Sequence, residues 1–228
     1  MSGTACSTNE PMSDSQVVIS LLARAPQFGT VKSRLARHVG PAQALRTHIA
    51  LLTHNLLVAH STGLPVELVV AGDTEHPWLV SLSERVRVPL LTQSDGDIGQ
   101  RMLACAARVT ATGRASLIIG SDCAAMSGDY LQRAASRLQD SVPMVFGPAE
   151  DGGYVLVGQN RAVPQAFADI SWGTQHVMQQ TRAALRQAAI EFDELETLWD
   201  VYTVADERRL RCSLRRRATQ FGKIFVPS

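Results

Sequence analysis

The sequence has almost no net charge and no long apolar run, and each absence excludes a class of protein. Its 22 Lys and Arg residues against 21 Asp and Glu residues give a formal net charge of +1, whereas nucleic-acid-binding domains are typically strongly basic. We therefore expect no nucleic-acid partner, and any anion site must be a local cluster of cations. No run of 18 apolar residues occurs, so no membrane span is expected.

Cysteine is also scarce, and none of its spacings forms a Cys-x-x-Cys pair. The four cysteines are Cys6, Cys105, Cys123 and Cys212, which indicates neither a zinc site nor a thioredoxin-like redox motif. Reduced thiols in a cytoplasmic protein are the simplest interpretation. Cys105 lies in an apolar helical segment, so we expect it in the core.

The composition that is present is typical of a globular protein, with a hydrophobic fraction of 45% and a charged fraction of 19%. Residues 1–16 are polar and lack the apolar segment of a signal peptide, so we interpret them as a disordered leader. One domain is expected over residues 17–210, followed by a C-terminal extension over residues 211–228. The basic cluster at 215–217 in that extension indicates a solvated helix end or a surface for an acidic partner.

Short β-rich segments alternate with helical patterns along the chain. In the helix predicted over residues 41–60, the apolar residues recur at spacings that place them on one face. The segment 115–120 is apolar throughout, as expected of a central strand that is buried on both faces. Further strands are predicted at residues 17–23, 66–71, 85–91, 142–147 and 154–158, and further helices after residue 73 and over residues 99–109, 128–139 and 175–188.

This alternation predicts an α/β protein with three layers and a mostly parallel, doubly wound sheet. Ligands of such sheets bind beyond the carboxyl ends of the strands. The segments that directly follow the strands are therefore the candidate functional segments.

The segment after the first strand, RAPQFGTVKSRL over residues 24–35, carries Arg24, Lys32 and Arg34. A loop that enters a helix offers free backbone N–H groups and the positive end of the helix dipole. With these cations it suits a diphosphate, because Arg can hold two phosphate oxygens and Lys supplies a compact charge. Its glycine spacing matches neither a Walker A loop nor a Rossmann fingerprint. An ordinary solvated basic loop is the alternative.

Four aspartates stand in other loops of interest. Asp122, in GSDCAAM after the central strand, could hold Mg²⁺ or Mn²⁺ or cap a helix, and Asp200, in WDVYT, has the same two interpretations. Asp151, in PAEDGGY, could belong to a hairpin turn, contact a sugar hydroxyl or act as a base. Asp97, in DGDIG, is interpreted first as part of a turn into the next helix.

Six segments occur in a characteristic order, namely RAPQFGTVKSRLA, QSDGDIGQRM, IIGSDCAAM, PAEDGGYVLVG, ISWGT and WDVYTVADERRL. In this order the chain resembles, over residues 17–210, a bacterial family of GT-A-like proteins. Members of that family are described as glycosyltransferases and once formed a domain of unknown function. The chain is similar, more distantly, to phospholactate and molybdenum-cofactor guanylyltransferases.

The resemblance implies a nucleotide-diphospho-sugar transferase fold, a nucleotide or nucleotide-sugar substrate, and a role for each segment. The residues implied to hold the nucleotide phosphates are Arg24, Ala25, Pro26, Gly29, Lys32 and Arg34, with Lys32 also catalytic. A divalent metal, Mg²⁺ or Mn²⁺, would be held by Asp122 and Asp200. Asp151 would be a catalytic carboxylate that faces the acceptor or sugar, and the other implied substrate-binding residues are Asp97, Gly152, Gly153, Trp172 and Thr174.

Two departures from the family's usual pattern bear on the metal. Ala124 stands where the family usually has Pro, and Tyr202 stands where it usually has a second acid. If that acid holds metal in the family, metal binding in this chain rests on Asp122 and Asp200 alone.

The leading functional hypothesis is transfer of a glycosyl group from a nucleotide sugar. The metal would neutralise the diphosphate leaving group, with Lys32 and Arg34 adding positive charge. Nucleotidyl transfer to a small phosphorylated acid would use the same pocket and release pyrophosphate. A nucleotide-binding protein without turnover is the third hypothesis, suggested by Tyr202. The sequence neither requires nor excludes a homodimer.

Overall fold

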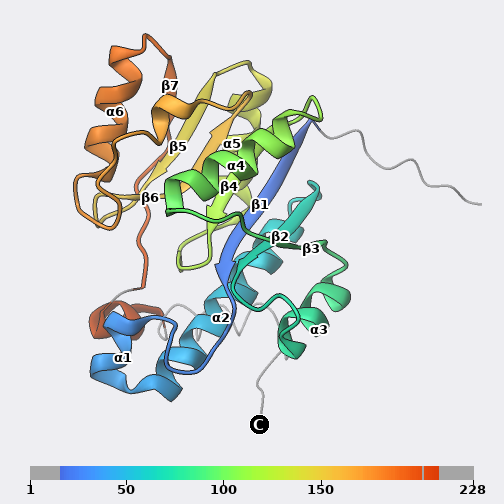
Figure 1. Ribbon diagram of the computed structural model, residues 1–228, viewed down its shortest axis with the longest axis vertical. Coiled ribbons are helices and arrows are strands. Elements are labelled where there is room, and N and C mark those ends of the chain that lie inside the picture. Colours follow the sequence, from blue (N-terminus) through green and yellow to red (C-terminus); the bar gives the residue numbers. More distant parts are fainter. Residues whose placement is uncertain (1–15, 202, 211–228) are drawn as a thin grey trace, which may run out of the picture.

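The computed structural model of the protein describes residues 16–201 and 203–210, which build one twisted sheet with helices on both faces (Figure 1). The predicted leader, apart from Gln16, the C-terminal extension with its basic cluster at 215–217, and Tyr202 lie outside the described residues.

Within the described residues, seven strands pair in the order β3-β2-β1-β4-β6-β5-β7. The strands are β1 (Val17–Arg24), β2 (Val66–Ala71), β3 (Leu90–Thr92), β4 (Ala115–Gly120), β5 (Met144–Pro148), β6 (Tyr154–Gln159) and β7 (Phe192–Glu194). The helices are α1 (Ser33–Val39), α2 (Pro41–His60), α3 (Pro77–Val86), α4 (Ile98–Thr110), α5 (Gly128–Gln139), the 3-10 turn η1 (Pro164–Ala166) and α6 (Val177–Gln187), and residues 204–210 are also helical.

All strands but one run in the same direction. β1 pairs in parallel with β2 and β4, β2 with β3, and β5 with β7. β6 is antiparallel to both of its neighbours, β4 and β5, because only a short turn connects β5 to β6 and a parallel connection needs a crossover of a dozen residues or more. The predicted three-layer, mostly parallel α/β fold is confirmed.

The core lies on both faces of the sheet. Leu117 and Ile118 on β4 are both buried but belong to different apolar clusters, since successive strand side chains point to opposite faces. Helices α2, α3 and α5 pack into the cluster that contains Leu117, and α4 and α6 pack into the other. The central strand is therefore apolar throughout because both of its faces are buried, as predicted.

The predicted strand over residues 85–91 is wrong over most of its length. Helix α3 continues to Val86, and Arg87 then ends it in a left-handed conformation with φ of 57°. Val88 is buried against the core after the helix has ended, and β3 begins only at Leu90. Val86 and Val88 alternate because one ends the helix and the other is buried against the core just after it. The predictions for 41–60, 66–71, 115–120 and 128–139 match α2, β2, β4 and α5.

The carboxyl ends of the parallel strands lie at one edge of the sheet, where α1 and the start of α2 form a separate lobe below β1 (Figure 1). β6 begins at the same edge because of its reversed direction. No helix among the described residues is long and apolar enough to cross a membrane.

Candidate active site

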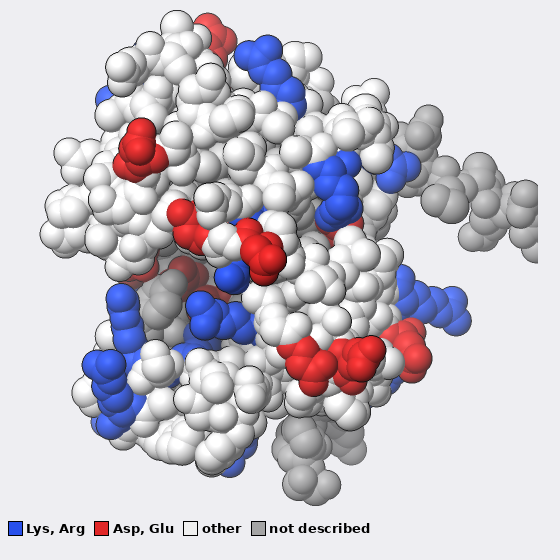
Figure 2. Space-filling model, viewed as in Figure 1, with Lys and Arg blue, Asp and Glu red and all other residues white. Residues whose placement is uncertain are grey.

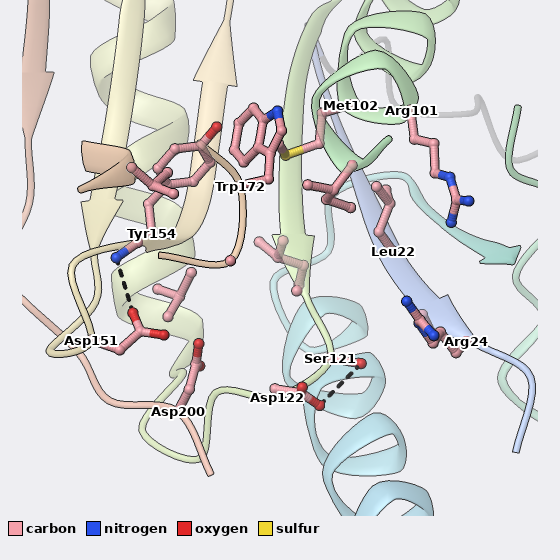
Figure 3. A pocket seen from close by; sticks show the side chains of 18 of the residues that line it. Leu22, Arg24, Arg101, Met102, Ser121, Asp122, Asp151, Tyr154, Trp172 and Asp200 are labelled. Carbon is pink, nitrogen blue, oxygen red and sulfur yellow. Dashed lines mark hydrogen bonds between the residues drawn. The ribbon is translucent and has the colours of Figure 1, made fainter. Parts of the chain in front are cut away.

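A cavity of about 930 Å³ opens at the carboxyl ends of the central strands, between β1 and β4 on one side and the start of β6 on the other (Figure 3). Most of the residues singled out in the sequence line it, namely Arg24, Lys32, Arg34, Asp97, Asp122, Asp151, Gly153, Trp172, Thr174 and Asp200. Four do not, namely Ala25, Pro26, Gly29 and Gly152. The structure thus brings together segments that are up to 176 residues apart, from Arg24 to Asp200.

At the surface around this cavity, Lys and Arg side chains gather mainly on one side and Asp and Glu side chains on the other (Figure 2). In Figure 2, Lys and Arg side chains gather on the lobe below a hollow, and Asp and Glu side chains lie along its upper edge. Arg24 ends β1, and Lys32 and Arg34 stand at the start of α1. Figure 3 shows Arg24 and Arg101 extending toward each other from β1 and α4, across from Asp151 and Asp200. An anionic ligand with a polar partner would match this separation of charge.

Lys32 joins three segments of the chain at the floor of the cavity. Its backbone is left-handed, with φ of 47° and ψ of 46°, although it is not a glycine. Its side chain is 4% exposed, and its Nζ donates to the carbonyl oxygen of Val201 at 3.0 Å and lies 2.9 Å from Oδ1 of Asp122. Non-glycine residues in this conformation cost about 1–3 kcal/mol and cluster at functional sites, so the ion pair holds a strained residue in place.

Asp122 is not a helix cap, which removes one of its two interpretations. Helix α5 is capped by Ser127, whose Oγ accepts from the backbone N–H of Tyr130 at 3.2 Å. Asp122 instead faces the cavity, with its carboxylate on Lys32 and within 3.5 Å of the hydroxyl of Ser121.

Asp200 is also not a cap, because Thr203 directly precedes the last helix and its hydroxyl accepts from the backbone N–H of Asp206 at 3.2 Å. Asp200 forms an isolated antiparallel bridge with Cys123, and the N–H of Val201 donates to the carbonyl oxygen of Asp122 at 3.2 Å. These bonds join the two backbone segments that carry the proposed metal ligands.

The two aspartates fit one kind of metal site. Among the described residues, no group of three or more His, Cys, Asp and Glu side chains is placed to hold an ion. Mg²⁺ commonly takes only one or two carboxylates and completes its shell with water and substrate phosphates. Asp122 and Asp200 therefore fit a divalent cation that arrives with a phosphate-containing ligand, although the ammonium of Lys32 competes for Asp122.

Asp151 lies in the turn between β5 and β6, so the hairpin interpretation of its segment is confirmed. Its Oδ1 accepts from the N–H of Gly153 at 2.9 Å, and its side chain is exposed to the cavity (Figure 3). Gly152 has φ of 87°, and a side chain there would collide with the backbone of Gln175. The N–H of Met178 donates to the carbonyl of Gly152 at 2.8 Å, so the turn is fixed under the loop that carries Trp172.

Trp172 forms the upper wall of the cavity and connects its two sides. Its ring lies 6.2 Å from the ring of Tyr154 at an interplanar angle of 83°. On its other side it packs over Gly99, where an added Cβ would lie 2.5 Å from the indole. Thr174 shapes the same loop by donating its hydroxyl to the carbonyl of Ser171 at 2.8 Å.

Asp97 caps α4, which confirms the interpretation of DGDIG as a turn into a helix. Its carboxylate accepts from the N–H of Gln100 at 2.8 Å, and the Gln100 side chain accepts from the N–H of Asp97 at 2.9 Å. One turn further, Nε of Arg101 donates to the carbonyl of Gly96 at 2.8 Å. Asp97 also lines the cavity.

The cavity residues that the sequence analysis did not single out include Gln93, Arg101 and His48. Arg101 stands in the quoted segment QSDGDIGQRM, and a cation one turn after a loop at a strand end could have been noticed. His48 lies among the apolar positions of α2, so its pattern is that of a core residue. Its Nε2 donates to the carbonyl of Arg24 at 3.0 Å, and burial lowers the pKa of its imidazole.

The cysteines that the structure describes have no chemistry at this site. Cys105 is buried in the core, as predicted, and Cys123 is 1% exposed. Burial raises the pKa of the Cys123 thiol to about 12, so the thiol stays protonated at neutral pH and is not a nucleophile.

The sheet order, the reversed strand and the cavity define the fold of the nucleotide-diphospho-sugar transferases. A proposed nucleotide-diphospho-sugar transferase from Desulfovibrio desulfuricans G20 is 25% identical, with a TM-score of 0.72 over 90% of this chain and 96% of that one. A nucleotidyl transferase from Methanothermobacter thermautotroptrophicus is 14% identical, with a TM-score of 0.57 over 88% and 98%. A CMP:2-keto-3-deoxy-manno-octonic acid synthetase in complex with CTP is 15% identical, with a TM-score of 0.54 over 89% and 100%.

The chain belongs to the family described as uncharacterized protein conserved in bacteria (DUF2064), whose model matches residues 55–174. This confirms the resemblance to a GT-A-like family that was once a domain of unknown function. No relative with a curated description matches the sequence.

Proposed function

We propose that this protein is a transferase that acts on a nucleotide-activated substrate, and that it transfers a glycosyl group from a nucleotide-diphosphate sugar to an acceptor. The observation that carries the proposal is the cavity at the strand ends, which Arg24, Lys32 and Arg34 line together with Asp151 and Asp200. Cations suit the diphosphate, and carboxylates suit a hydroxyl group that loses a proton.

The cations would act on the leaving group. As the glycosyl bond breaks, negative charge develops on the nucleoside diphosphate, and fixed positive groups near it lower the barrier. Arg24 and Arg34 can each hold two phosphate oxygens. Lys32 is a compact charge on a side chain that is fixed by Val201 and Asp122, so little ordering is needed during the reaction.

Asp122 and Asp200 would hold the divalent metal, Mg²⁺ or Mn²⁺. When bound, the metal would neutralise charge on the diphosphate. The two carboxylates come from segments that are tied together by the backbone bridge between Cys123 and Asp200.

Asp151 and Trp172 would form the acceptor side. Asp151 is held by its own turn and exposed to the cavity, so it can accept a proton from an acceptor hydroxyl or orient it. Trp172 provides a flat apolar wall above it, which suits the apolar face of a sugar ring.

A second candidate function is nucleotidyl transfer to a small phosphorylated acid. The observation that favours it is Arg101, a fourth cation that extends toward Arg24 (Figure 3). Four cations would match a triphosphate better than a diphosphate. This reaction releases pyrophosphate, whereas glycosyl transfer releases a nucleoside diphosphate.

The test combines binding and product analysis. Thermal unfolding is measured against nucleoside diphosphates, nucleoside triphosphates and nucleotide sugars, each with and without Mn²⁺. A ligand at a hundred times its Kd should stabilise the protein by about 2.7 kcal/mol, which raises Tm by about 5–11 °C for a chain of this size. Asp122→Ala should abolish the metal-dependent part, and Asp95→Ala, an exposed aspartate outside the cavity, should keep it.

Each outcome has a separate meaning. A metal-dependent shift with a nucleotide sugar, followed by release of a nucleoside diphosphate, supports glycosyl transfer. A shift with triphosphates alone, followed by release of pyrophosphate, supports nucleotidyl transfer. Binding without either product indicates a nucleotide-binding protein without turnover. No shift with any ligand contradicts all three.

A further inference from the structure

Acidic residues are absent from a long stretch of the chain that forms the lobe below the cavity. Residues 15–66 contain five Lys and Arg residues and four His residues but no Asp or Glu, although the whole chain has a net charge of only +1. This stretch builds β1, α1 and α2, and α1 with the start of α2 forms the lobe (Figure 1). The positive charge of the lobe is therefore not balanced within its own sequence.

Three arginines of the lobe are exposed and have no acid beside them. Arg37 lies in the last turn of α1 and Arg46 near the start of α2. Arg208 lies in the helix over residues 204–210, which belongs to the same lobe because it packs against α2 in a common apolar cluster. Among the residues that the structure describes, none of these three guanidinium groups forms an ion pair.

The last helix contains two acids, and both are engaged inside the lobe. Asp206 accepts hydrogen bonds from the N–H and the hydroxyl of Thr203, at 2.8 and 2.7 Å. Glu207 is only 5% exposed, and its carboxylate accepts from the amide of Gln43 on α2 at 3.0 Å. The exposed cations therefore remain available to a partner outside the molecule.

One large apolar side chain projects from the same lobe, in the loop that leads into α1. Phe28 is 62% exposed, more than any other large apolar side chain among the described residues. It stands at the corner of a turn in which the N–H of Thr30 donates to the carbonyl of Gln27 at 3.3 Å. Ala25 and Val31, on either side of the turn, are buried. Both ends of the turn are thus anchored, and its corner is held outward.

An anionic lipid surface fits this combination better than an acidic protein does. The core of a protein interface is a contiguous apolar patch, but none of the other exposed large apolar side chains lies in the turn or in α1. A bilayer surface accepts a single aromatic side chain at the level of its headgroups, beside cations that hold the lipid phosphates. Arg suits this role because its planar guanidinium can hold two phosphate oxygens.

We propose that this lobe binds the surface of an anionic lipid membrane, with Phe28 inserted among the headgroups and Arg37, Arg46 and Arg208 on the lipid phosphates. The protein would lie on the membrane without crossing it. None of these four residues lines the cavity, so the inference does not depend on the proposed function. Because the hollow lies directly above the lobe in Figure 2, the cavity would stay close to the membrane.

The experiment is co-sedimentation of the full chain with lipid vesicles in the absence of nucleotide. Vesicles of phosphatidylcholine mixed with phosphatidylglycerol are compared with vesicles of phosphatidylcholine alone. The protein should bind only the anionic vesicles, and its binding should weaken as the salt concentration rises, since salt screens exposed charges. Absence of binding to the anionic vesicles would overturn the inference.

Arg37→Gln combined with Arg46→Gln tests the cations. Each cation near an anionic surface contributes about fivefold to the affinity, so the pair should weaken binding by about thirtyfold. The matched control is Arg161→Gln combined with Arg186→Gln, which removes the same charge from exposed residues after β6 and at the end of α6. The control should bind the vesicles nearly as well as the unaltered protein, and equal losses in the two pairs would contradict a role for the lobe.

Phe28→Ser tests the insertion and should weaken vesicle binding by about tenfold. Phe28→Trp, which keeps an aromatic ring suited to the membrane interface, should bind normally. Val80→Ser, which removes an exposed apolar side chain from α3, is the control and should also bind normally. Equal binding by Phe28→Ser and the unaltered protein would overturn the inference, because cations without an inserted ring fit an acidic protein equally well.

Two further results would also overturn the inference. Binding that survives in the Arg37 and Arg46 variant, but is lost when residues 215–217 are replaced by Gln, would belong to the C-terminal extension. Loss of nucleotide stabilisation in Phe28→Ser would assign this side chain to the cavity. Failure of the proposed function leaves the result unaffected, because vesicle binding is measured without any nucleotide.

Discussion

The ammonium of Lys32 lies 2.9 Å from a carboxylate oxygen of Asp122, so the residue proposed to hold phosphate is paired with the residue proposed to hold metal. The pair is shielded unequally, with Lys32 4% exposed and Asp122 32% exposed. A metal that approaches without a nucleotide meets a carboxylate that is already neutralised. Phosphate groups would offer Lys32 another partner and leave Asp122 for the metal.

The first prediction concerns this competition. Lys32→Met should increase the affinity for Mn²⁺ in the absence of nucleotide, because it removes the cation from Asp122. The same variant should bind nucleoside diphosphates more weakly, since it removes a phosphate-binding charge. Electron paramagnetic resonance of free Mn²⁺ measures the first effect and calorimetry the second. Arg37→Met, which removes an exposed cation from the last turn of α1, is the control and should change neither. Unchanged Mn²⁺ affinity in Lys32→Met would contradict the competition.

The second prediction concerns stability far from the cavity. Glu67 on β2 is 9% exposed, and its carboxylate is held by the guanidinium of Arg108 and by the hydroxyl of Ser20 at 2.5 Å. Arg108→Met leaves this carboxylate without its cation. The free energy of unfolding should fall by about 1–3 kcal/mol, less than for a fully buried pair because Arg108 is itself half-exposed.

Urea unfolding measures this change, and a second ion pair provides its control. Arg133 pairs with Glu196 at the surface, where both side chains are about half exposed. Arg133→Met should therefore lower stability by less than about 1 kcal/mol. Equal losses in the two variants would mean that burial of Glu67 does not decide the effect.

The third prediction concerns pH. Burial lowers the pKa of His48, so the unfolded chain takes up a proton at this residue at a higher pH than the folded protein does. The contribution of His48 to stability is complete above the unfolded pKa of about 6.5 and is lost as the pH falls toward the lowered folded pKa. His48→Gln, whose amide can still donate to the carbonyl of Arg24, should lose less stability than the unaltered protein over that interval. Parallel curves of unfolding free energy against pH for the two proteins would contradict the prediction.

The fourth prediction concerns the wall above the cavity. Gly99→Ala places a methyl group 2.5 Å from the indole of Trp172, so the ring must move. Overpacking of this kind costs about 1–3 kcal/mol, and the fluorescence of Trp172 should change. Gly128→Ala, whose methyl group would meet its nearest neighbour, the hydroxyl of Ser61, at 3.4 Å, is the control and should fold normally. If the acceptor binds under Trp172, Gly99→Ala should raise the KM for the acceptor more than the KM for the donor.

Much of the fold could be predicted because its central elements have strong local patterns. The apolar segment that became β4 and the one-sided helix that became α2 match the predicted residues. The edge strands β3 and β7 have three residues each, which is too short for a period of two to be visible. Arg87 could not be foreseen as a helix end, because its left-handed conformation follows from how α3 packs against the core.

The candidate site was predictable where charge and strand ends coincide in the sequence. Arg24, Lys32 and Asp122 lie at or after the ends of two strands that are neighbours in the sheet, so their approach follows from topology. Gln93 could not be found in this way, since its position in the cavity depends on hydrogen bonds to two carbonyl groups on other strands. The pairing of Lys32 with Asp122 also needed the structure, because it depends on the conformation of one loop.

Because β6 runs antiparallel to its neighbours, the two walls of the cavity are built by different kinds of connection between strands. The wall with Arg24 and Gln93 is built by parallel strands, whose crossovers span both faces of the sheet, so a change there affects distant packing. The wall with Asp151 is built by the β5–β6 turn, residues 149–153, which joins neighbouring strands directly and is independent of those crossovers. A lineage with this fold could therefore keep one half of its site constant while the other half diversifies toward new acceptors.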